Sequence, residues 1–157
     1  MATRVGGLAA ALIAAVLAGP AAALVPAHLV AGFPRGQVIL ETAGPRCLLI
    51  HVYLPASPSQ RAQGLMFVEA MDEFEGMYFA HGEPAELVMW MKNTRLSLDM
   101  LFVRADGAIT TIERNTEPYS MRRISSGGPV VGVLELNAGF ASRWRVAPGT
   151  RLQVFGG

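Results

Sequence analysis

Short apolar stretches separated by turn residues run along most of the chain after residue 37. Cys47 to Leu54 illustrates the pattern, because Leu48, Ile50 and Val52 fall on one face of an extended segment. Similar stretches predict further strands at 38–42, 77–80, 87–91, 96–104, 109–114, 130–136 and 151–155. Eight short strands indicate a mainly β (α+β) fold, either a small antiparallel β-barrel or a sandwich-like domain.

One or two short helices interrupt this pattern. In "SPSQ", Ser57 and Gln60 form a capping box and Pro58 occupies the first helical position, so a helix begins there. Gly64 follows where a left-handed residue ends a helix, and it turns the chain back towards the core. "NAGFASRW" predicts a second helix, capped by Asn137.

Two hairpins are predicted in the middle of the chain. Asp106-Gly107 suits the positive φ values of a tight two-residue turn. The stretch "MWMKNTRLSLDMLF", residues 89–102, reads as two strands joined by the connection "KNTR". That hairpin is unusual because it carries lysine, asparagine and aspartate among tryptophan, methionines and leucines.

Asp99 is the residue of this stretch that most needs a partner. It alternates with apolar residues on a covered face, and an unpaired buried carboxylate costs several kcal/mol or is held neutral. Backbone N–H groups of "KNTR", Lys92 and Arg61 are the candidate donors. Asp99 therefore either pins the 92–95 loop or docks the first helix, or it helps to line a shallow polar pocket. The residues of that pocket would be Arg61, Trp90, Lys92, Asn93, Asp99 and Glu135.

Glu135 raises a similar question within "VLELN". Leu134 and Leu136 face one way and Glu135 the other, which fits plain strand alternation with apolar residues inside and the acid facing solvent. If Glu135 instead shares a face with Asp99, the two carboxyl groups could act as acid and base. The sequence leaves both interpretations open.

The N-terminus has the pattern of an export signal. Residues 1–23 combine a short basic start, an apolar stretch and small residues, and Ala21 and Ala23 match the small-x-small cleavage pattern. We expect cleavage after Ala23; cleavage after Ala27 or an uncleaved anchor are the alternatives. Residues 24–37 read as a linker, and a single β-rich domain follows at 38–157. The predicted location is periplasmic or secreted, with membrane contact only through an uncleaved N-terminal segment.

The composition of the chain limits the classes of molecule that it is expected to bind. The chain has 157 residues, 13 Lys+Arg and 12 Asp+Glu, and no basic stripe, which argues against nucleic acid as a partner. Removing residues 1–23 takes away Arg4 and no acid, so the mature chain would be formally neutral. Cys47 is the only cysteine, so no internal disulfide can form and stability must come from the core.

Five motifs in order resemble a known prokaryotic family, the domain of unknown function 192. They are "RAQGLM" (61–66), "GMYF" (76–79), "WMKNT" (90–94), "LDMLF" (98–102) and "LELNAG" (134–139). The resemblance spans Val38 to Phe155 and implies a small, mostly β, barrel-like fold that is often exported. It implies no established activity, so no catalytic residues are carried over. The family often has an acid and an arginine near the helix where this chain has "SPSQRAQ", so only Arg61 can be mapped there.

Three functional hypotheses follow. The favoured one is a non-catalytic ligand-binding or interaction module of the cell envelope without a cofactor, whose partner is a small molecule, a glycan or an envelope protein. It is favoured because no G-x-S-x-G motif occurs and His28, His51 and His81 stand in unrelated contexts. The second is a hydrolase-type enzyme that uses Asp99 and Glu135. The third is copper binding through methionine and histidine, although core filling explains the embedded methionines better.

Overall fold

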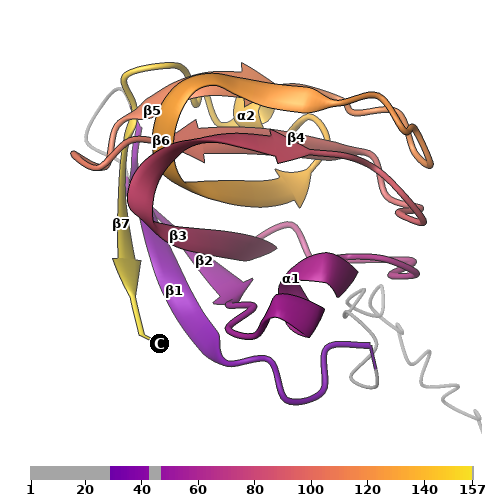
Figure 1. Cartoon of the computed structure of the whole chain (residues 1–157). Helices are drawn as coiled ribbons and strands as arrows, with labels where there is room; N and C mark the ends of the chain where they lie inside the picture. Colours follow the sequence, from indigo (N-terminus) through magenta and orange to yellow (C-terminus); the bar gives the residue numbers. More distant parts are fainter. Residues whose placement is uncertain (1–28, 43–46, 157) are drawn as a thin grey trace, which may run out of the picture.

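The computed structural model describes residues 29–42 and 47–156, which form one seven-stranded sheet with two short helices (Figure 1). The strands are β1 (Arg35–Glu41), β2 (Cys47–Tyr53), β3 (Glu75–Met89), β4 (Leu98–Val103), β5 (Ile109–Glu113), β6 (Ile124–Asn137) and β7 (Arg151–Phe155). The helices are α1 (Pro58–Gln63) and α2 (Phe140–Arg143). The strand order is β5-β4-β6-β3-β2-β1-β7, and only the β2–β3 pair is parallel.

The sheet is strongly curved without closing into a barrel. Its edges, β5 and β7, approach each other through a single bridge between Ala108 and Arg151. Two apolar clusters fill the two faces. One includes Leu134 and Leu136 with residues of β1 and β2, and the other includes Met77 and residues beside α1. The predicted mainly β class with few helices is therefore confirmed in its sandwich-like form.

β3 and β6 are long curved strands that organise the sheet (Figure 1). The strands predicted separately at 77–80 and 87–91 are one strand, β3, and the "SSGGP" segment predicted as a loop lies inside β6. Register shifts between Ala80 and Ala85 bend the pair, and such bulges accommodate glycine and proline that would otherwise end a strand. Glycine and proline residues therefore mark bends within these strands as well as the ends of strands.

The hairpin predicted at residues 89–102 is wrong. β3 and β4 are not neighbours, because β6 lies between them and pairs with both. The second predicted hairpin is confirmed, since β4 pairs with β5 across the Asp106-Gly107 turn. Of the two turn residues only Gly107 has a positive φ, 78°, and its N–H donates to the Arg104 carbonyl at 2.9 Å.

Of the two predicted helix caps, one is confirmed and one is wrong. The capping box of α1 is confirmed, because the Ser57 hydroxyl accepts from the Gln60 N–H at 3.1 Å and the Gln60 side chain accepts from the Ser57 N–H at 3.1 Å. The Asn137 cap of α2 is wrong. Asn137 is the last residue of β6, and its amide donates to the carbonyls of Met71 and Asp72 at 2.9 and 3.0 Å.

The predicted linker is partly built into the fold. β1 begins at Arg35, three residues before the predicted start, and Val30 and Phe33 are buried in the cluster beside α1. The predicted signal peptide, residues 1–23, both cleavage positions and the turn at 43–46 lie outside the described residues, so they stay predictions. Within residues 29–42 and 47–156, no helix has the length and apolar character needed to cross a membrane.

Asp99 is fully buried and held by two backbone donors. Its Oδ1 accepts from the Asn115 N–H and its Oδ2 from the Ala141 N–H, each at 2.9 Å. Burial with a nearby donor is confirmed, but the predicted donors, Lys92 and Arg61 among them, are wrong. Asp99 joins the loop after β5 to the start of α2, because its side chain projects to the sheet face opposite α1.

Replacing Asp99 should therefore lower stability. In Asp99→Ala the N–H groups of Asn115 and Ala141 lose their buried acceptor, and we expect the free energy of unfolding to fall by about 3 kcal/mol. Urea denaturation followed by tryptophan fluorescence measures this. Asp99→Asn retains one acceptor oxygen and should lose less. A loss below about 1 kcal/mol in the alanine variant would show that water satisfies both donors.

Candidate functional site

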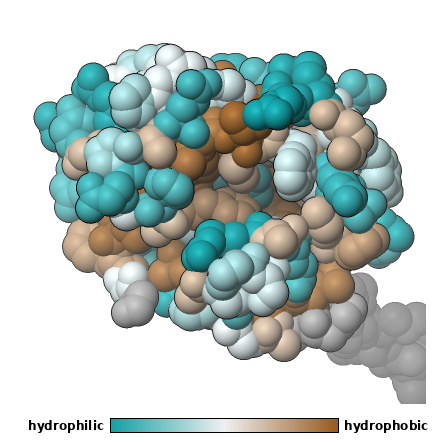
Figure 2. All heavy atoms as spheres, in the orientation of Figure 1, coloured by the Kyte–Doolittle hydropathy of each residue, from teal (hydrophilic) through white to brown (hydrophobic). Residues whose placement is uncertain are grey.

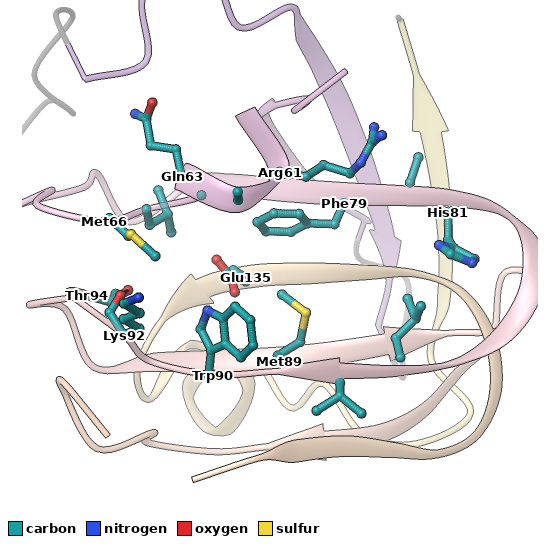
Figure 3. A pocket seen from close by; sticks show the side chains of 16 residues that line it. Arg61, Gln63, Met66, Phe79, His81, Met89, Trp90, Lys92, Thr94 and Glu135 are labelled. Carbon is teal, nitrogen blue, oxygen red and sulfur yellow. Dashed lines mark hydrogen bonds between the residues drawn. The ribbon is translucent and has the colours of Figure 1, made fainter. Parts of the chain in front are cut away.

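A cavity of about 210 Å³ lies between α1 and the adjacent face of the sheet. Figure 2 shows it as a hollow with apolar side chains inside and hydrophilic residues around the opening. Figure 3 shows the side chains that line it, which come from α1 and the turn after it, two parts of β3, the segment after β3, and β6. Those used below are Met66, Phe79, His81, Met89, Trp90 and Glu135.

The end of α1 forms one wall because Gly64 lets the chain turn there. Gly64 has φ 50° and ψ −135°, a positive φ outside the helical left-handed conformation predicted for it. A Cβ at this position would lie 3.2 Å from Cζ of Phe79, so glycine also allows the helix end to approach β3 closely. Leu65 then enters the apolar core and Met66 faces the cavity.

The segment after β3 forms the opposite wall, and one backbone hydrogen bond ties it to the chain following α1. The Phe67 N–H donates to the Asn93 carbonyl at 2.9 Å. Asn93 adopts a positive φ of 54°, and the Thr94 N–H closes this turn onto the Met91 carbonyl at 3.1 Å. The two walls are therefore held at a defined separation by main-chain contacts.

Glu135 supplies a carboxyl group inside the cavity. It lies in β6 opposite Met77 of β3 and Met100 of β4, and only 4% of the residue is exposed. Close approach of β3 depends on Gly76, since a Cβ there would lie 2.6 Å from the Glu135 carbonyl oxygen. The Glu135 side chain points into the cavity (Figure 3).

No group among residues 29–42 and 47–156 satisfies this carboxyl. Within the described residues it makes no hydrogen bond, and the four ion pairs all involve other acids. Its oxygens are also not sealed in the core, so they remain accessible from the cavity. Burial raises the pKa of Glu135 to about 8, because the charged form loses its hydration. At neutral pH Glu135 is therefore mainly a neutral acid that can both donate and accept hydrogen bonds.

The structure brings together four of the six residues predicted for a pocket. Arg61, Trp90, Lys92 and Glu135 line the cavity, but the Arg61 guanidinium turns away from it and donates to the Ala56 carbonyl at 2.7 Å (Figure 3). Trp90 is half exposed and Lys92 is exposed, so both lie at the opening.

Asn93 and Asp99 are outside the lining. Asn93 donates its side-chain amide to Sδ of Met66 at 3.8 Å. Asp99 pairs in register with Leu136, whereas Met100 pairs with Glu135. Because neighbouring residues of a strand face opposite sides, Asp99 and Glu135 point to opposite faces of the sheet. The acid–base pair of the hydrolase hypothesis is therefore wrong.

Sequence reasoning missed Met66, Phe79, His81 and Met89, which form much of the cavity wall. Met66 and Phe79 end the motifs "RAQGLM" and "GMYF", and these motifs were the available signal. His81 and Met89 carry no pattern that distinguishes them from other strand residues.

Most of the described methionines lie in the core or at the cavity, and Met121 is exposed. Core residues, among them Met77, Met91 and Met100, are buried in the apolar cluster beside α1, whereas Met66 and Met89 line the cavity. Residues 29–42 and 47–156 contain no cluster of three or more His, Cys, Asp or Glu side chains placed to hold a metal ion. The core methionines therefore fill apolar space, and Met66 and Met89 supply polarisable cavity walls.

Two crystal structures resemble this chain. A protein from Sinorhizobium meliloti 1021, described as a candidate transcription regulator, is 48% identical with a TM-score of 0.75, over 78% of this chain and 95% of that one. A protein of unknown function from Novosphingobium aromaticivorans DSM 12444 is 32% identical with a TM-score of 0.75, over 94% of this chain and 99% of that one. A comparison with curated proteins gives no match.

The family model DUF192, described as "Uncharacterized ACR", matches residues 38–154. This span contains α1, β3, β6 and every cavity residue described above. The match confirms the resemblance carried by the five sequence motifs. The chain, with its α1-covered sheet and its buried, unpartnered glutamate, belongs to the DUF192 family.

Proposed function

We propose that this protein is a non-catalytic ligand-binding module of the cell envelope, and that the cavity beneath α1 holds a small organic molecule. The observation that carries this proposal is that the Glu135 carboxyl is buried and makes no hydrogen bond or ion pair within the described residues. Unpaired carboxyl groups are rare in protein interiors because burial without a partner costs free energy. A ligand that pairs with Glu135 would offset this cost, and its binding would explain why the carboxyl is placed there.

The cavity has the composition of a small-molecule site. Such sites combine mostly apolar walls with a few convergent polar groups, and here Phe79, Met66 and Met89 surround the Glu135 carboxyl. The volume of about 210 Å³ lies below the roughly 300–1,000 Å³ typical of pockets for drug-sized ligands. The ligand is therefore small, or only one end of it enters.

Features at the opening suit reversible binding. Trp90 is 51% exposed beside the cavity, where a flat apolar surface can cover a bound molecule. The backbone link between Phe67 and Asn93 holds the two walls in place before a ligand arrives. A preformed site avoids much of the ordering cost of binding.

Two other functions have less support. A hydrolase needs a second group within reach of the substrate, and Asp99, the acid expected to fill this role, is on the opposite face. The Sinorhizobium relative is described as a candidate transcription regulator, so a role in transcription is the other function considered. However, α1 and α2 have only six and four residues, and four arginines are paired with carboxylates rather than free for phosphates.

The envelope part of the proposal rests on the N-terminal segment. Residues 1–23 have the basic start, apolar stretch and small-residue pattern of a cleaved export signal. A periplasmic or secreted location follows from this pattern.

Glu135→Gln should change how stability depends on pH. The folded-state pKa of about 8 exceeds the ordinary 4.5, so the stabilisation from the protonated acid is complete below pH 4.5 and is lost as pH rises towards 8. Across this window the native protein should lose about 1.4 kcal/mol per pH unit relative to the variant, which cannot titrate there. Urea denaturation at several pH values from 5 to 8 measures the difference.

A matched surface variant controls for general pH effects. Glu83→Gln removes an exposed acid from β3 away from the cavity lining, and it should follow the native pH dependence. Parallel curves for the native protein and Glu135→Gln would contradict the assignment of a proton to Glu135.

Filling the cavity should abolish binding without unfolding the protein. Ala62 is an exposed residue of α1 that lines the cavity, so the side chain of Ala62→Trp can enter the opening. Ser59→Trp places the same side chain on α1 outside the lining. In an NMR screen of small organic fragments, we expect hits for the native protein and Ser59→Trp, and a loss of at least tenfold in affinity for Ala62→Trp. Equal affinities in all three proteins would place binding elsewhere.

A further inference from the structure

We propose that the ligand of this cavity is a small organic cation, a protonated amine whose ammonium group lies against the Glu135 carboxyl and whose carbon skeleton lies against Phe79 and Trp90. This inference rests on the proposed function and specifies the chemical class of the molecule bound. Its starting point is the geometry of the site: one buried carboxyl, directed into a cavity, without a cationic partner from the protein (Figure 3).

Among the described residues no cationic side chain pairs with Glu135, although two line the same cavity. Arg61 and Lys92 are both in the lining, yet neither pairs with Glu135. Arg61 is engaged by the Ala56 carbonyl and turned away, and Lys92 is exposed to solvent at the opening. A buried carboxylate is stable only with a compensating charge and hydrogen-bond donors. A ligand ammonium supplies both, because it carries one positive charge and up to three N–H donors.

The other walls also favour a cation. Phe79 and Trp90 place aromatic rings in the lining, and the faces of such rings attract positive charge. The thioether sulfurs of Met66 and Met89 are polarisable and accept weak hydrogen bonds. An anionic ligand would meet an acid at the centre of the site and electron-rich walls around it, so its charge would be repelled once Glu135 ionises.

The groups around Glu135 do not provide an alternative partner. On its own face its cross-strand neighbours are Met77 and Met100, which do not titrate. The titratable groups that line the cavity from the packed elements are Arg61 of α1, His81 of β3 and Lys92 of the segment after β3. His81 is exposed and, like Lys92, contributes no hydrogen bond to Glu135.

A second acid on the same face of β3 is already satisfied. Glu75 accepts from the Tyr53 hydroxyl at 2.8 Å, and the Arg35 guanidinium donates to that hydroxyl at 2.9 Å and lies over the Tyr53 ring. Burial, followed by the bond to Glu75, raises the pKa of Tyr53 to about 12, so Tyr53 stays a neutral donor. Of the two buried glutamates on this face, Glu135 is the one left for a ligand.

Binding of an amine should exchange a proton. Below pH 8 the free site holds a neutral acid, and the ammonium group binds only after that proton leaves to solvent. One proton is released for each cation bound, so charge is balanced within the site. The apparent dissociation constant should therefore fall about tenfold per pH unit between pH 6 and 7, and level off above pH 8. Primary alkylamines stay protonated over this range, as lysine side chains do.

Three probes with one carbon skeleton test the charge requirement. The full-length protein, labelled with ¹³C at the methionine methyl groups, is titrated with n-butylammonium, n-butanol and n-butyrate at constant ionic strength. We expect n-butylammonium to shift the Met66 and Met89 resonances with the highest affinity, in the pH-dependent manner given above. In Glu135→Gln, n-butylammonium should bind at least tenfold more weakly, whereas Glu83→Gln should bind as the native protein does. Dispersed methionine resonances show that each variant is folded, and the native pH dependence tests Glu135 without any substitution.

The outcomes separate the cation proposal from the proposed function. Tighter binding of n-butanol or n-butyrate at the same methionines overturns the cation class and leaves a ligand-binding cavity. The same result follows from n-butylammonium binding that is independent of pH and unchanged in Glu135→Gln. No shift at Met66 and Met89 with any probe overturns both proposals.

Discussion

The register of β6 against β3 and β4 is the constraint on which this structure depends. β6 pairs with both neighbours, so its alternation is locked to theirs. Glu135, Met77 and Met100 project to the face beneath α1, and Leu136 and Asp99 project to the other. A slip of β6 by one residue would exchange its two faces and move Glu135 away from α1. Close contact of β3 with β6 at Gly76 makes such a slip sterically costly.

The two acids separated by this register are stabilised in different ways. Asp99 is fully buried, and two backbone N–H groups donate hydrogen bonds to its carboxyl oxygens. These donors come from the loop after β5 and the start of α2, so the same contact closes the fold on that face. Glu135 has no donor in the part of the chain that the structure describes, and burial keeps it mainly protonated near neutral pH by raising its pKa to about 8. One acid is therefore structural, and the other remains available to a molecule from outside.

Three of the five described non-glycine residues with a positive φ lie in segments joined to the wall of the cavity. Phe67, Asn93 and Tyr119 have φ values of 65°, 54° and 61°, which non-glycine residues rarely adopt. Hydrogen bonds join their segments, because Phe67 donates to Asn93 and Tyr119 donates to Thr94. Strain of this kind persists only where surrounding contacts enforce it, and it often accompanies functional regions. Phe67, Trp90 and Tyr119 are also exposed to solvent, and Trp90 lines the cavity.

Local features of the sequence determined the elements whose information is carried within a few residues. The capping box at Ser57 and the alternation of β2 formed as predicted, and so did the hairpin at Gly107, although only one of its two turn residues has a positive φ. Each depends on neighbouring side chains and backbone conformation. The burial of Asp99 was also predictable, since a charged residue among apolar neighbours has few alternatives. The family was recognisable from five short motifs.

Only the tertiary structure decided which strands pair and which side chains meet. Nothing local shows that β6 separates β3 from β4, because pairing partners are chosen by burial summed over whole strands. The partners of Asp99 lie 16 and 42 residues away, and the cavity combines segments from Arg61 to Glu135. The alternation of side chains along a strand indicated which of its residues share a face. Only the register between strands could show that Glu135 lies beneath α1 and that Asp99 does not.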